Sequence, residues 1–184
     1  MTPISHLSLL CHPACNAAAV RTLSASAHRT ADGGLWLAYR LRGDISRLRI
    51  AEPSLNPAQT DRLWEQTCFE AFIAGTGKAA YREYNFAPSG DWAVFEFSDY
   101  RLPTALNMPP PPRIEMRKTE GRLEVDAFLA PQCLPPSVGG YEIGLSAVVE
   151  ATDICDGCHS YWSLHHAGER PDFHRRESFI LRLD

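Results

Sequence analysis

The chain has 184 residues, about the size of one domain, and its 18 Lys and Arg against 22 Asp and Glu give a formal net charge of −4. Its 45% hydrophobic residues exclude disorder along the whole length, and a chain of this size can form a core without metals or disulfides. The mild acidity argues against nucleic-acid binding, which needs a basic face. We therefore expect one globular domain over residues 1–184.

The N-terminal region does not have the order of a secretory signal. Its first basic residue, Arg21, follows the apolar part, which His12, Pro13 and Asn16 interrupt, whereas a signal peptide begins with positive charge. No run of residues approaches the 18 apolar positions that a transmembrane helix needs. We expect a cytoplasmic protein with no membrane partner, in which the six Cys are mostly reduced thiols.

Strand patterns dominate the chain, because hydrophobic and polar residues alternate in several short segments. In chain order these segments are residues 35–42, 83–86, 123–129, 143–149 and 179–183. Turn signals lie between the patterns, at residues 32–34, 88–91, 120–121, 139–140 and 156–157. The run of prolines in Met108–Arg113 predicts an extended surface crossing between two halves of the domain. This organisation favours an antiparallel sandwich or barrel.

Residues 56–75 allow two interpretations. Their apolar residues fall at helical spacing, Asn56 and Pro57 suit the first positions of a helix, and Gly75 suits its C-cap. By these local rules the segment is a helix. The alternative is a turn followed by a strand at about residues 67–74, which the following resemblance implies.

Two segments resemble the central signature of DOMON-like domains. Residues 63–74 read LWEQTCFEAFIA and residues 81–92 read YREYNFAPSGDW, which match a Trp, a strand with E-x-F-I, and then Y-x-E-Y-N-F-x-P-S-G-x-W. Residues 160–174 are similar to the closing segment of a bacterial subgroup without assigned activity. The superfamily includes family nine of the carbohydrate-binding modules and haem-binding members. The resemblance implies an all-β fold, an antiparallel β-sandwich of DOMON-like or immunoglobulin-like jelly-roll type with at most one short helix.

The resemblance also implies a ligand site, because sugar-binding relatives flank their ligand with a Trp and a Glu six residues later. The matching residues here are Trp64 and Glu70. An aromatic ring can pack on the C–H face of a pyranose, while a carboxylate accepts hydrogen bonds from hydroxyls. Trp162 is the expected second aromatic. The full set of expected ligand-binding residues is Trp64, Glu70, Arg82, Asn85, Arg101, Trp162, His165 and His174.

These residues predict a non-catalytic domain that binds a carbohydrate or a similar polyhydroxylated small molecule. The chain lacks the acidic loop expected of the family's calcium sites, so we expect neither a metal nor another cofactor. In the plainer alternative, Trp64 closes the end of the sandwich and Glu70 pairs with Arg82.

Other motifs leave further functions open. Cys155–His159 fits the C-x-x-C-H pattern of covalent haem attachment and would make the chain a haem-binding or redox module, although its Asp-Gly centre also suits a tight hairpin. A small metal-dependent enzyme could use His165, Asp172 and His174, with His166 beside them. A zinc site would combine Cys155 and Cys158 with two N-terminal thiols, Cys11 and Cys15. Paired carboxylates at Glu70 and Glu83 could hydrolyse a glycoside.

Overall fold

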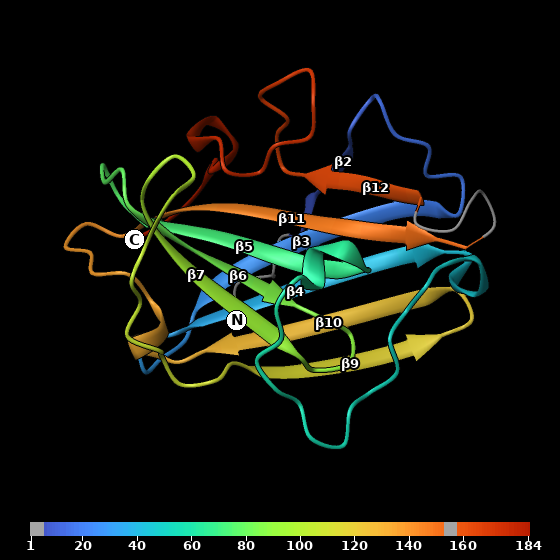
Figure 1. Cartoon of the computed structure of the whole chain (residues 1–184), viewed down its shortest axis with the longest axis horizontal. Coiled ribbons are helices and arrows are strands. Elements are labelled where there is room, and N and C mark those ends of the chain that lie inside the picture. Colours follow the sequence, from blue (N-terminus) through green and yellow to red (C-terminus); the bar gives the residue numbers. More distant parts are fainter. Residues whose placement is uncertain (1–5, 153–157) are drawn as a thin grey trace.

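The computed structural model describes residues 6–152 and 158–184, and these residues form two antiparallel sheets that lie one over the other (Figure 1). The smaller sheet has the strand order β1 (Leu7–Ser8), β3 (Val20–Arg29), β4 (Leu35–Gly43), β10 (Arg122–Leu129), β9 (Arg113–Thr119). The larger sheet has the strand order β2 (Leu10–Cys11), β12 (Cys158–Ser163), β11 (Tyr141–Ala151), β5 (Cys68–Gly75), β6 (Tyr81–Phe86), β7 (Trp92–Asp99), β8 (Leu102–Thr104). A further strand, β13 (Leu181–Leu183), lies outside this order and pairs with β11. The expected antiparallel β-sandwich is confirmed.

The helical segments of the described chain are short 3-10 turns. They are η1 (Ile45–Arg47), η2 (Leu63–Glu65), η3 (Pro131–Cys133) and η4 (Arg176–Ser178). Among the described residues, no helix is long and apolar enough to cross a membrane.

The core between the sheets follows from the alternating patterns. On β4 the side chains of Leu35, Leu37, Tyr39 and Leu41 are fully buried, and β10 and β11 contribute their own alternate hydrophobic residues to the same core. The Tyr39 hydroxyl donates a hydrogen bond of 2.7 Å to the backbone carbonyl of Glu70, which joins the two sheets across the core.

In residues 56–75 the prediction of a helix is wrong, and the turn followed by a strand is right. Residues 63–65 form the turn η2 and β5 then runs from Cys68 to Gly75. Strand β5 lies between β11 and β6, and every one of its residues is buried. A strand buried on both faces is hydrophobic at nearly every position, so its sequence does not alternate and also fits helical spacing.

The larger sheet has a second apolar layer on its outer face, and this layer positions the candidate site. On β5, Phe69, Ala71 and Ile73 belong to the core between the sheets, whereas Cys68 and Phe72 belong to two smaller clusters outside it. Those outer clusters include residues of η2 and of the C-terminal segment that follows β12.

The proline-rich segment joins the two sheets as predicted. Strand β8 belongs to the larger sheet and β9 to the smaller one, and residues 105–112 between them have no regular structure. The predicted turn at residues 88–91 contains Gly90 with φ of 91°, a conformation that glycine adopts without strain. The predicted turn at residues 156–157 lies outside the described residues.

Candidate ligand-binding site

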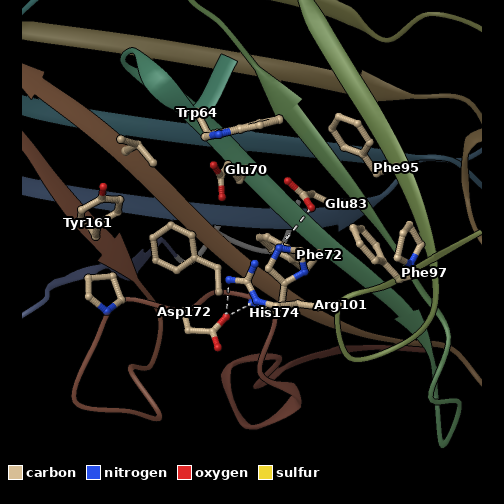
Figure 2. A pocket seen from close by; sticks show the side chains of 14 residues that line it. Trp64, Glu70, Phe72, Glu83, Phe95, Phe97, Arg101, Tyr161, Asp172 and His174 are labelled. Atoms are coloured by element: carbon tan, nitrogen blue, oxygen red, sulfur yellow. Dashed lines mark hydrogen bonds and ion pairs between the residues drawn. The ribbon is translucent and has the colours of Figure 1, made fainter. Parts of the chain in front are cut away.

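A cavity of about 430 Å³ lies on the outer face of the larger sheet, between η2, the β7–β8 turn and the C-terminal segment. This volume lies within the usual range for small-molecule sites. Figure 2 shows Trp64 at one end and the Arg101, Asp172 and His174 side chains at the opposite end. The lining residues are Trp64, Glu70, Phe72, Glu83, Phe95, Phe97, Arg101, Pro103, Val148, Tyr161, Pro171, Asp172, Phe173 and His174.

The turn before β5 presents Trp64 at the mouth of the cavity. Arg62, which begins this turn, has φ of 63° in the left-handed region, and its guanidinium pairs with Glu65. Trp64 itself is 41% exposed and meets Phe95 edge to face, with 5.8 Å between the ring centroids. An indole held in this way offers a partly open aromatic surface to a ligand.

Glu70 and Glu83 form the carboxylate floor of the cavity. They point to the same face of neighbouring strands, because Phe72 pairs with Glu83 in the register of β5 and β6. Their exposed fractions are 3% and 6%. Burial and the charge of Glu83 raise the pKa of Glu70 to about 8, and burial also raises the pKa of Glu83. Because the pKa of Glu70 lies above 7, its carboxyl group favours the protonated form at neutral pH.

The direct partners of these carboxylates are neutral and few. Glu70 accepts hydrogen bonds from the Ser146 hydroxyl at 3.3 Å and the Cys68 thiol at 3.5 Å. Glu83 accepts a 2.8 Å hydrogen bond from the Asn85 side-chain amide. These contacts hold both carboxyl groups in place without supplying a compensating positive charge.

The opposite end of the cavity is a network around Asp172 and His174. Arg101 pairs with Asp172 at 3.0 Å, and Asp172 also accepts a hydrogen bond from the Tyr100 hydroxyl. Although burial opposes it, hydrogen bonding by Tyr100 and Arg101 lowers the pKa of Asp172. His174 Nε2 lies 3.6 Å from Glu83, and its Nδ1 is 2.8 Å from the Tyr81 hydroxyl. Burial and the charge of Arg101 lower the pKa of His174 to about 4, so this imidazole is neutral at pH 7.

Four of the eight predicted site residues meet in the cavity. Trp64 and Glu70 lie at one side, and Arg101 and His174, which are far away in sequence, join them from the β7–β8 turn and the C-terminal segment. Asn85 lies just beneath the floor, where it is fully buried and orients Glu83.

The other three predicted residues lie elsewhere. The Arg82 side chain donates to the carbonyls of Cys133 and Leu134 at 3.0 and 3.1 Å, and it pairs with Glu96 instead of Glu70. Trp162 is buried in the core between the sheets, where its indole donates to the Ser160 hydroxyl at 2.9 Å. His165 is exposed beyond the end of β12 and does not line the cavity.

The second aromatic wall comes from Tyr161 rather than the predicted Trp162. Successive residues of a strand point to opposite faces, so this difference of one position exchanges a core residue for a cavity residue. Phe95 and Phe97 were not predicted either, although their spacing of two along β7 places both on the face of the cavity. That spacing is the signal that could have identified them.

The structure also bears on the metal and cysteine hypotheses. In the described part of the chain, no three His, Cys, Asp or Glu side chains are grouped so that they could hold a metal ion. Cys11 and Cys15 are free thiols, and Cys158 is disulfide-bonded. The remainder of the predicted C-x-x-C-H motif before Cys158 lies outside the described residues, and His159 Nε2 is 2.9 Å from the backbone carbonyl of Glu65.

No family model matches the chain, and no curated protein matches it either. Solved structures do resemble it. A Bacteroides uniformis protein provisionally assigned as carbohydrate-binding has 15% sequence identity and a TM-score of 0.61, with 96% of this chain and 84% of that chain covered. A family 9 carbohydrate-binding module from Caldicellulosiruptor kristjanssonii, solved with cellotriose, has 11% identity and a TM-score of 0.55, with 88% of this chain and 72% of that chain covered. The chain therefore shares the β-sandwich fold of these proteins.

Proposed function

We propose that this chain is a non-catalytic binding domain for a carbohydrate or a similar polyhydroxylated small molecule, held in the cavity beside Trp64. The single observation that carries the proposal is the combination of an open indole, at 41% exposure, with two carboxyl groups on the cavity floor. Aromatic faces pack against the C–H groups of a sugar ring, and carboxyl groups bind its hydroxyls.

The shape and chemistry of the cavity support a ligand of about one or two sugar rings. Its volume of about 430 Å³ suits a small molecule, and its walls alternate aromatic rings with hydrogen-bonding groups. The fold is also one on which a sugar site exists, because the Caldicellulosiruptor module was solved with cellotriose. Membership of the DOMON-like superfamily is part of the same proposal and rests on the signature in residues 63–92.

Binding to a panel of immobilised glycans tests the proposal, with Trp64→Ala as the cavity variant. The matched control is Trp36→Ala, because Trp36 is also a partly exposed indole but lies on β4 of the smaller sheet, stacked with Phe128. We expect Trp64→Ala to weaken binding by about tenfold or more while Trp36→Ala retains it. Equal binding by both variants would place the ligand elsewhere, and the absence of any glycan binding would refute the proposal.

A further inference from the structure

The two carboxyl groups on the cavity floor lack a cationic partner in the described chain. No Lys or Arg side chain of the described residues lies within ion-pair distance of Glu70 or Glu83, and the neutral His174 is 3.6 Å from Glu83, too far for a hydrogen bond. A buried carboxylate without a cation is unfavourable, and such groups are normally paired or protonated. The floor is therefore a place where a positive charge would be stabilised.

The guanidinium that lines the cavity is paired within the network at the far end, although its charge also offsets part of the rise in the pKa of Glu83. Arg101 is engaged by Asp172 at 3.0 Å, and its guanidinium lies over the ring of Tyr100, 5.9 Å from the centroid. The lining as a whole has three carboxyl groups against this one guanidinium. The lining therefore has more acidic groups than permanent cations, although Glu70 is protonated at neutral pH until a cation lies against it.

In the described chain, no arginine guanidinium lies over an aromatic ring that lines the cavity. Among the described residues, arginine guanidinium groups lie over the rings of Tyr100, Phe128, Tyr141 and Phe179. None of these four residues lines the cavity. Trp64, Phe95, Phe97 and Tyr161 line the cavity around the two carboxyl groups. Rings and carboxylates together stabilise an organic ammonium ion, because the ring faces and the carboxylates both attract positive charge.

We propose that the ligand of this cavity bears a protonated amino group, which lies against Glu70 and Glu83, so that the preferred ligands are amino sugars rather than neutral sugars. This inference rests on the proposed function, since it names the chemical class of sugar that the same cavity selects. The hydroxyl-bearing ring packs beside Trp64, and the ammonium group supplies the positive charge that the floor lacks.

Calorimetric titration of the whole chain at pH 6 tests the inference with glucosamine, galactosamine and mannosamine. Each amino sugar is compared with its neutral parent and its N-acetyl derivative, which keep the ring but remove the charge. We expect at least one amino sugar to bind about tenfold or more tighter than both of its neutral counterparts, as the pairing of a largely buried charge predicts. Neutral sugars that bind as tightly would overturn the inference and leave the proposed function standing, whereas no binding by any sugar would refute both.

Two substitutions test whether the floor is the source of the preference. Glu70→Gln and Glu83→Gln keep the shape of each side chain while removing its ability to ionise against the ammonium group, and either one should reduce the preference for the amino sugar to within about threefold. Glu115→Gln is the control, because Glu115 lies on β9 of the other sheet and pairs with Arg113 and Arg117. If both floor variants keep the preference for the amino sugar, the assignment to these carboxyl groups is overturned. If a variant fails to fold, the comparison of amino and neutral sugars on the unaltered chain still tests the inference.

Discussion

Replacing Glu70 by Gln should make the free energy of unfolding less dependent on pH near neutrality. The pKa of Glu70 is about 8 in the folded chain because of burial and the charge of Glu83, against 4.5 for an ordinary Glu. Between these two values the folded state holds a proton that the unfolded state has lost, so stability falls as pH rises. The loss is about 1.4 kcal/mol for each pH unit.

The choice of pH range matters because His174 changes the free energy of unfolding with pH in the opposite direction to Glu70. Its pKa is lowered to about 4 by burial, so its contribution to stability rises with pH up to the ordinary value of 6.5 and is then complete. Between pH 6.5 and 7.5 His174 therefore no longer opposes Glu70, and Glu83, whose pKa burial also raises, acts in the same direction as Glu70 in both chains. We expect the wild-type chain to lose roughly 1.4 kcal/mol more than Glu70→Gln over this single unit.

Urea unfolding at pH 6.5 and 7.5 measures this difference, with Glu115→Gln as an exposed control that should behave as the wild type. Ser146 and Cys68 donate to different oxygens of Glu70, so in the variant the amide oxygen can accept one of these hydrogen bonds while the amide NH2 donates to the other partner, and the fold should persist. If the wild type and Glu70→Gln lose the same stability between the two pH values, Glu70 is ionised in the folded chain and the account of the carboxylate floor is wrong.

Three further outcomes follow from the same contacts. Between pH 6.5 and 4 the contribution of His174 to stability falls by about 1.4 kcal/mol per pH unit, because burial lowers its pKa, and this loss opposes the gain from Glu70; His174→Gln should therefore be more stable relative to the wild type at pH 4 than at pH 6.5, and a constant difference in urea unfolding would contradict this. Arg82→Leu should cost about 2 kcal/mol, because the Leu134 carbonyl loses its side-chain donor and the Cys133 carbonyl keeps only the Tyr84 hydroxyl, yet it should not alter sugar affinity, and a tenfold loss of affinity would return Arg82 to the site. Tyr39→Phe should cost about 1 kcal/mol in thermal or urea unfolding, since it removes the hydrogen bond to the Glu70 carbonyl, and an unchanged stability would refute that bond.

The sequence was most informative where a strand has one buried face. The alternation in residues 35–42 and 123–129 predicted β4 and β10 closely, because every second side chain of these strands lies in the core between the sheets. The central strand β5 is buried on both faces, so its pattern misled the local rules, and the likeness to a known signature was needed to identify it as a strand.

In the candidate site, too, the sequence pattern did not show which face of a strand each side chain occupies. Tyr161 and Trp162 are adjacent aromatic residues, and the sequence alone does not indicate which one faces the core. Arg82 alternates with Tyr81 and Glu83 on β6, so it points to the other face of the sheet from the carboxylate floor. Arg101 and Glu70 line the same cavity because of how a turn packs against a sheet, which no local pattern encodes.

The most direct test of the central claim is a nitrogen–proton NMR titration that follows the four Trp indole signals as glucosamine or glucose is added. Trp64 lines the cavity, whereas Trp36 lies on the other sheet and Trp92 and Trp162 are buried in the core. The account predicts that the Trp64 signal shifts in a saturable way, more strongly at a given concentration of glucosamine than of glucose, while the Trp36 and Trp162 signals stay in place. A saturable shift at Trp36 without one at Trp64 would contradict it, as would the absence of a Trp64 shift with glucosamine, galactosamine and mannosamine alike.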